Sequence, residues 1–446
     1  MVELLCKTEL DTVTVFNDLN EKQVKLRIGI EPSNDIRTRL SRESELNNGV
    51  DYCIVIDKNI DRMREVIDSI SGILVRLRDI DTMSIVTYTD SPQVIVDSAT
   101  REDIKSTLDI LERGIISNYK KSNLHLALKQ ARQILENKSQ DRIKKAILIS
   151  NTEEEINPYI VNEVFEYGKE SIIVDCIAIG EDTNYSILEQ IASRLGGITN
   201  LIKQYTEVDM PIRESINRCK NAILTNVKMK IKFNPSARIR HIYRGKPANS
   251  YIGRGKSDNE LVVNIGNVEI NRMYEYYFDM AMNIKPEIHQ KIKQIGTDQG
   301  ILLAKGIIEY NVPLYDNKKV TFEINPQIVF TNNQNKIKKN EDVSRGYCEV
   351  EITKLDNELS KYAAVGDKTR VMYCVERIVQ NCNKIGNTDL LKQYIQIIKY
   401  YEETGLLDKK MLSGARSSSS KPSNSSVLQP VKIDANTLER IKSLTK

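Results

Sequence analysis

The sequence predicts an α/β fold: a doubly wound, mainly parallel sheet that is inserted in a β-sandwich and followed by a small helical bundle. Three features support this prediction. Short apolar runs alternate with helical patterns across residues 49–222, which is typical of a parallel sheet covered by helices. Residues 1–45 and 223–335 show period-two alternation, as in the strands of a sandwich. Residues 350–410 return to helical periodicity.

The α/β unit has strands predicted at its apolar runs, 53–56, 83–88, 94–96, 146–149 and 172–179. Helical patterns fill the intervals at 63–77, 104–111, 124–135 and 187–195, the last of them ended by Gly196 and Gly197. In such a fold, ligands bind outside the carboxyl ends of the strands, where loops from several strands meet. The functional site is therefore expected at that edge.

The first 45 residues predict a pair of strands, at 13–19 and 24–28, joined by a turn at 20–22. Two strands alone are not stable in water. We therefore expect them to complete the sandwich formed by residues 223–335, so that the α/β unit is an insertion between two pieces of one β domain.

The last 36 residues, 411–446, are predicted to form a flexible, disordered tail, because the serine-rich stretch 413–426 has too few apolar groups to pack. Within this tail, residues 434–444 predict a short helix with an apolar stripe at Leu438, Ile441 and Leu444. Such a segment either docks into a groove or frays.

Composition excludes several classes of protein. The net charge of +4 is a small difference between 65 basic and 61 acidic residues, so nothing indicates nucleic-acid binding. No signal peptide and no membrane span is apparent. Seven widely spaced cysteines argue against a disulfide framework. We expect a cytoplasmic protein that acts away from membranes.

Enzyme motifs are not evident. The three histidines form no metal-binding pair, and no Gly-x-Ser-x-Gly or Cys-x-x-Cys element occurs. Residues 250–257 end like a phosphate-binding loop, but a strand pattern follows where that loop requires a helix. A non-enzymatic role is therefore expected.

Polar side chains cluster at three predicted loops of the carboxyl edge. Asp57, Asn59 and Asp61 follow the first strand, Asn151 follows the strand at 146–149, and Ser122, Asn123 and His125 lie at the start of the helix at 124–135. The alternative interpretation is that Asp57 and Asp61 cap the following helix.

Residues 50–222 resemble the von Willebrand factor type A (VWA) family, because the first strand ends in Asp57, residues 121–124 enter the helix at 124–135, and the strand at 146–149 ends in Ser150 and Asn151. The resemblance implies a metal-ion-dependent adhesion site, where an Asp-x-Ser-x-Ser loop, a Thr and a second Asp hold a divalent ion and a ligand carboxylate completes its shell. The flanking segments look like those of bacterial cytoplasmic VWA proteins and, loosely, inter-α-trypsin-inhibitor heavy chains.

The adhesion-site pattern is modified in this chain. Asn59 and Asp61 replace the two serines, Ser122 stands where Thr is usual, and Asn151 replaces the last Asp. The oxygen inventory of Asp57, Asn59, Asp61, Ser122 and Asn151 still suits Mg²⁺, or alternatively Mn²⁺ or Ca²⁺. The longer side chains would crowd a direct copy of the family's coordination, so a polar, metal-free site is the alternative.

The first functional hypothesis is a non-enzymatic intracellular interaction module. Its carboxyl-edge loops, with Asp57, Asp61, Ser122, Asn123, His125 and Asn151, would bind an acidic or polar side chain of a protein partner. The resemblance implies a MoxR-type AAA+ ATPase as the class of partner. The alternative is a scaffold or regulatory target that acts through phosphorylation of the serine-rich tail.

Overall fold

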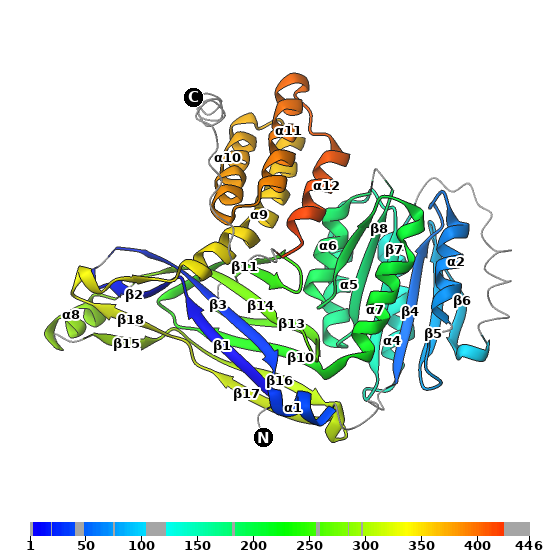
Figure 1. Cartoon of the computed structure of the whole chain (residues 1–446), viewed down its shortest axis with the longest axis horizontal. Coiled ribbons are helices and arrows are strands. Elements are labelled where there is room, and N and C mark those ends of the chain that lie inside the picture. The colour runs from blue at the N-terminus through cyan, green and yellow to red at the C-terminus, as the bar shows by residue number, and fades with distance from the viewer. Residues whose placement is uncertain are drawn as a thin grey trace.

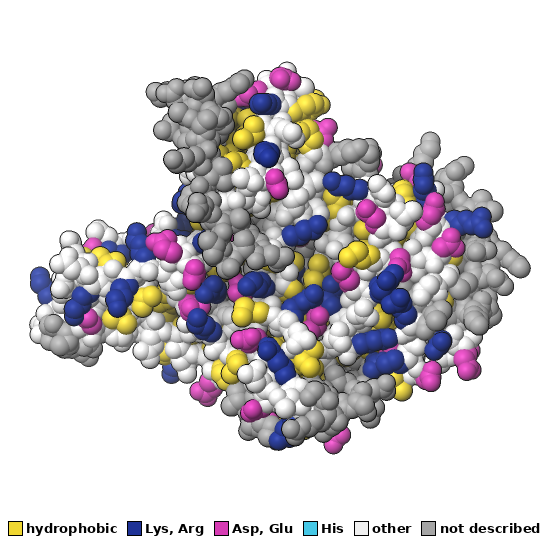
Figure 2. Space-filling model, in the orientation of Figure 1, with side chains coloured by type: hydrophobic (Ala, Val, Ile, Leu, Met, Phe, Trp, Pro, Cys, Tyr) yellow, Lys and Arg dark blue, Asp and Glu magenta, His cyan; other side chains and the backbone are white. Residues whose placement is uncertain are grey.

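The computed structural model describes residues 3–422, apart from residues 19, 41–48, 75, 104–121, 181–182, 256–258, 284 and 296–297. Figure 1 shows three parts, an elongated β domain, an α/β domain at one end of it, and a helical bundle above the region where the two meet. None of the described helices is long and apolar enough to cross a membrane. Figure 2 shows basic and acidic side chains interspersed over one face of the molecule.

The α/β domain contains a six-stranded sheet in the order β6-β5-β4-β7-β8-β9. All neighbours are parallel except β5 and β6. The central strands read as continuous apolar runs because both faces of the sheet are covered. The strands are β4 (Val50–Asp57), β5 (Thr82–Tyr88), β6 (Pro92–Ala99), β7 (Ile143–Ser150), β8 (Ile173–Ile179) and β9 (Thr199–Ile202).

Helices cover both faces of this sheet, which confirms the doubly wound prediction. Helices α2 (Met63–Leu74) and α7 (Asp209–Lys220) pack on one face. Helices α4 (Leu124–Glu136), α5 (Pro158–Lys169) and α6 (Tyr185–Arg194) pack on the other. The sequence did not predict α5, α7 and β9, and the helix predicted at 104–111 lies outside the described residues.

The β domain is a sandwich with one shared apolar core. Ile28 pairs with Tyr276, so strands from both sides of the α/β domain form one sheet. The first sheet has the order β1-β3-β14-β11-β12 and the second β13-β10-β16-β17. Their strands are β1 (Leu4–Leu10), β3 (Lys22–Pro32), β14 (Tyr274–Met282), β11 (Ala237–Lys246), β12 (Ser250–Arg254), β13 (Glu260–Glu269), β10 (Ala222–Phe233), β16 (Ala304–Val312) and β17 (Lys318–Ile324).

A further small sheet, β15-β18-β2-β19, extends this domain. It contains β2 (Thr12–Phe16), β15 (Gln299–Leu302), β18 (Gln327–Thr331) and β19 (Lys338–Lys339). The predicted pairing of 13–19 with 24–28 is therefore wrong. The strand β3 pairs with β1 instead, and β2 runs parallel to β18. The chain bends at Asp11, whose carboxylate accepts a hydrogen bond from the Lys25 backbone N–H. This bend directs β2 into the small sheet, beside β18. Two short helices, α1 (Asn34–Leu40) and α8 (Pro286–Ile295), also belong to this region.

The bundle consists of α9 (Glu341–Ala364), α10 (Lys368–Ile385), α11 (Thr388–Thr404) and α12 (Lys409–Ser419). The prediction of a flexible tail from residue 411 is wrong for α12. The Arg416 guanidinium donates to the Asp356 carbonyl (2.6 Å) and to Ser360 Oγ (2.7 Å), and Ser419 Oγ donates to the Asp356 carboxylate (3.2 Å). These polar contacts add to the packing of Leu412 and Ala415 in the apolar core of the bundle. Residues 423–446, with the helix predicted at 434–444, lie outside the described residues.

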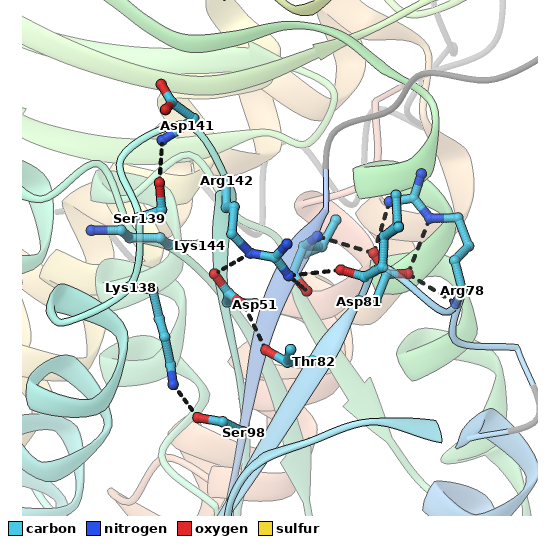
Figure 3. A network of polar contacts seen from close by, with 12 residues as sticks. Asp51, Arg78, Asp81, Thr82, Ser98, Lys138, Ser139, Asp141, Arg142 and Lys144 are labelled. Atoms are coloured by element: carbon cyan, nitrogen blue, oxygen red, sulfur yellow. Dashed lines mark hydrogen bonds and ion pairs between the residues drawn. The ribbon is translucent and has the colours of Figure 1, made fainter. Parts of the chain in front are cut away.

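The amino edge of the α/β sheet carries a network of charged groups (Figure 3). Arg142 Nε donates to the Asp51 carboxylate at 2.8 Å, and Thr82 Oγ1 donates to the same carboxylate at 2.5 Å. Asp81 accepts from Arg78 Nη2 at 2.8 Å and from the Val50 backbone N–H at 3.0 Å. These two carboxylates thus connect loops and strands at the amino edge of the sheet.

Candidate functional site

Asp57, the last residue of β4, lies at the centre of the carboxyl edge and is fully buried. Its Oδ1 accepts from Ser122 Oγ at 2.7 Å and from the Asn59 backbone N–H at 3.1 Å. Its Oδ2 accepts from Ser150 Oγ at 3.4 Å. Burial raises the pKa of Asp57, although these hydrogen bonds oppose the rise. The structure thus brings Asp57 and Ser122 together, as the sequence predicted.

Asn59 and Asn151 join this network through their side-chain amides. Asn59 Nδ2 donates to Ser122 Oγ at 2.8 Å, and Asn151 Nδ2 donates to the Asn59 carbonyl at 2.8 Å. Asn59 Oδ1 is buried and has no hydrogen-bond partner among the described residues. Loops after β4 and β7 and the segment before α4 are therefore cross-linked by short polar contacts.

Asn123 and His125 lie at the start of α4. Asn123 caps this helix, since its Oδ1 accepts from the Leu126 N–H at 3.2 Å. His125 is the second residue of the helix, with Nε2 3.8 Å from a Glu163 carboxylate oxygen. Its ring is 5.4 Å from that of Tyr159, centroid to centroid. Asn123 thus serves as the N-cap of α4, whereas His125 lies at the rim of the site.

Asp61 does not join the other predicted residues. Its side chain is exposed and does not line the cavity formed by them. The preceding residue, Ile60, turns into the apolar core of the domain, and this turn directs Asp61 away. Asp61 lies near Tyr205, whose pKa is raised by burial and by the Asp61 charge. The second carboxylate that the sequence predicted for the site is therefore missing from it.

The site opens into a cavity of about 740 Å³, the carboxyl-edge cavity. Glu153, Glu154 and Tyr159 line it and were not predicted. Glu154 accepts a hydrogen bond from the Leu124 backbone N–H at 2.9 Å. The run of three glutamates directly after Asn151 and Thr152 could have indicated them. The remaining lining residues are Asp57, Asn59, Ser122, Asn123, His125, Asn151, Thr152 and Asn157.

Comparison with known proteins identifies the α/β domain. The family model of the von Willebrand factor type A domain matches residues 53–207. These residues form a VWA domain. A search of curated protein sequences gives no significant match.

Solved structures with the same arrangement include a von Willebrand factor type A protein from Catenulispora acidiphila, with a TM-score of 0.71 and 16% identity, covering 94% of this chain and 97% of that one. The ArnB paralog VWA2 from Sulfolobus acidocaldarius follows, with a TM-score of 0.57 and 15% identity over 94% and 98% of the two chains. The human COPII-coat protein Sec24c has a TM-score of 0.50 and 10% identity over 83% and 57%. At these identities the likeness concerns the fold.

The site of this VWA domain does not fit the metal coordination that the family resemblance implies. Asn59 and Asn151 direct N–H groups into the network at positions where the family has oxygen ligands. The Asp57 carboxylate already accepts hydrogen bonds at both oxygens. Binding of Mg²⁺, Mn²⁺ or Ca²⁺ at this VWA domain stays a prediction for experiment.

Proposed function

We propose that the VWA domain binds a protein partner at the carboxyl-edge cavity and accepts a basic side chain of that partner. VWA domains are protein-interaction modules, and the charge of the lining supports this choice of ligand. Asp57, Glu153 and Glu154 supply carboxylates, and no Lys or Arg is among the described residues that line the cavity. An acidic partner side chain would meet like charge unless a cation intervened. A basic one meets opposite charge directly.

The rim of the cavity suits a guanidinium group. Tyr159 is 69% exposed and presents a flat ring beside His125. Arg side chains stack on aromatic faces and bind carboxylates through two parallel hydrogen bonds. Glu153 is exposed at the mouth of the cavity, where a partner side chain would arrive first. An Arg that passes Glu153 and covers Tyr159 would use both kinds of contact.

As the class of partner we propose a MoxR-type AAA+ ATPase, on the family resemblance alone. The alternative function, phosphorylation of the serine-rich segment, has less support. Ser419 and Ser420 are buried, and Ser420 Oγ lies 3.2 Å from the Tyr185 hydroxyl of α6. A kinase could reach these two hydroxyls only after α12 had left its position.

Reversing the charge of Glu153 tests the proposed function. We expect Glu153→Lys to weaken binding of a short peptide that alternates arginine and glycine about tenfold, since one charge-assisted contact is worth about 1.4 kcal/mol. Fluorescence anisotropy with a labelled peptide measures this. Glu155→Lys is the matched control, because Glu155 is exposed and lies outside the cavity lining. Equal weakening in both variants would show only a general effect of surface charge and would refute the proposal.

Addition of Mg²⁺ tests whether a cation takes part. A ligand that binds the folded form raises its apparent stability. Under the proposal, millimolar Mg²⁺, Mn²⁺ or Ca²⁺ leaves the midpoint of thermal unfolding unchanged. A rise that is lost in Asp57→Asn would instead favour the metal-bridged version, in which the partner supplies a carboxylate.

A further inference from the structure

A second and larger hollow lies between the VWA domain and the β domain. It has a volume of about 1250 Å³ and is lined by α5 and α6 on one side and by the strands β12, β13, β10, β16 and β17 on the other. Figure 1 shows α5 and α6 beside β13 and β10. Lys228 Nζ of β10 donates to the Gly168 carbonyl of α5 at 3.2 Å and connects the two sides. We call this hollow the basic groove.

The charge of the basic groove is opposite to that of the carboxyl-edge cavity. Two of its three glutamates are already paired, since Glu309 lies 2.8 Å from Lys230 Nζ and Glu260 forms an ion pair with Lys232. The groove therefore retains a clear excess of positive charge. Its seven basic lining residues are Lys169, Arg194, Lys228, Lys230, Lys232, Arg254 and Lys305.

Two of these cations are half-buried without a carboxylate partner among the described residues. The hydrogen bond of Arg194 is a long one, from Nε to the Ile252 carbonyl at 3.4 Å. Burial lowers the pKa of Arg194. Burial and the nearby Lys230 also lower the pKa of Lys228, although Glu309 and Glu170, which form no ion pair with it, partly oppose this. Buried charges are normally paired because desolvation is costly. An anion that entered the groove would supply the missing partner for both.

Apolar side chains flank these charges. Phe165 of α5 is 60% exposed and Val262 of β13 is 59% exposed, and both line the groove, as does the exposed Val161. Exposed apolar groups within a charged rim are typical of protein-binding surfaces. A peptide that carries carboxylates and apolar side chains matches this combination.

We propose that the basic groove binds an acidic, partly apolar peptide segment of a protein partner, separately from the carboxyl-edge cavity. A single-stranded nucleic acid matches the groove less well. Such ligands stack their bases on several aromatic side chains, and Phe165 is the only aromatic residue among the described residues of the lining.

The test uses the whole protein and a labelled synthetic peptide that alternates glutamate and leucine. We expect saturable binding by fluorescence anisotropy, with about tenfold loss in Arg194→Gln and in Lys305→Glu, as for one charge-assisted contact. Lys305 is exposed, so its replacement does not disturb the core, and thermal unfolding of each variant verifies the fold. Lys318→Glu is the control, because Lys318 is exposed on β17 but lies outside the groove.

Three results would overturn the proposal. They are no binding by the wild-type protein, equal loss in Lys318→Glu, and tighter binding of a single-stranded oligonucleotide than of the peptide. Glu153→Lys serves to separate the two sites. If it weakens the arginine peptide and leaves the acidic peptide unaffected, the carboxyl-edge cavity and the basic groove bind independently.

Discussion

Replacing Arg416 by methionine is expected to lower the free energy of unfolding by about 3 kcal/mol, because two hydrogen bonds from a buried charged group are lost. The guanidinium donates to the Asp356 carbonyl and to Ser360 Oγ. It also lies close enough to the buried Asp356 and Glu189 to lower the pKa of both carboxyls. Burial still raises the pKa of Asp356 to about 6 and that of Glu189 to about 8. Without Arg416 both carboxyls would become harder to ionise in the folded protein.

Urea denaturation and hydrogen exchange measure this effect. Exchange should rise first in α12, since its last turn depends on Arg416 and Ser419 for contact with α9. Arg64→Met is the matched control. Arg64 is exposed on α2, so the same substitution there should change the free energy of unfolding by less than about 0.5 kcal/mol. Unchanged exchange of α12 in Arg416→Met would mean that the helix is held by other contacts.

Replacing Asp175 by alanine is expected to cost about 3–5 kcal/mol, the usual effect of removing one member of a buried ion pair. Asp175 on β8 lies 2.6 Å from Lys145 Nζ on β7, forms an ion pair with Arg218 of α7, and accepts from Ser215 Oγ at 2.5 Å. Lys145 and Asp175 are almost completely buried. Alanine would remove the carboxylate that both cations contact directly, leaving the buried Lys145 and the largely buried Arg218 with Glu269 as the nearby counter-charge.

The Asp175 carboxylate also makes the free energy of unfolding depend on pH, and the direction of this dependence can be predicted. Burial alone would raise the pKa of Asp175, but Arg218 and Lys145 hold it well below its usual range. A group whose pKa is lower in the folded state stabilises the fold above its unfolded pKa of about 4, and this contribution is lost as the pH falls below that value. Asp175→Asn keeps the shape and removes the charge. Urea denaturation measures the free energy of unfolding of wild type and of Asp175→Asn. The difference between the two free energies should become smaller below about pH 4. A difference that stays constant with pH would contradict this role of Asp175.

The fold of the α/β domain could be predicted from the sequence because its strands are continuous apolar runs and its helices are amphipathic. These patterns are local, so β4, β7 and β8 and helices α2, α4 and α6 were predicted close to their observed positions. Helix α7 was missed because its apolar residues are few, Ile212 and Ile216 being its main core contacts. The pairing of β2 and β3 was wrong because strand partners depend on distant residues, such as Tyr276 for Ile28.

The candidate site was predicted in part for the same reason. The position of Asp57 at the end of a buried strand is a local property, and so is the start of α4 at Asn123. The direction in which a side chain points within a loop is not a local property of the sequence. Asp61 turns away because Ile60 enters the core, and Glu153 and Glu154 enter the lining because of the path of the loop after β7. Helix α12 was missed since, of its described side chains, only Leu412 and Ala415 are buried in the bundle core, and the hydrogen bonds of Arg416 and Ser419 that add to this packing are not indicated by composition.

The insertion of the VWA domain between β3 and β10 also sets an order of events during synthesis. The strands of the VWA sheet all lie between Val50 and Ile202, so this domain can complete its core while translation continues. Strands β1 and β3 emerge earlier, yet β14, the other neighbour of β3, begins only at Tyr274. Until then a nascent chain carries a finished VWA domain beside open strand edges, which are the features that promote aggregation. The edge of β3 that later pairs with β14 therefore stays open in the nascent chain until the second half of the β domain has been made.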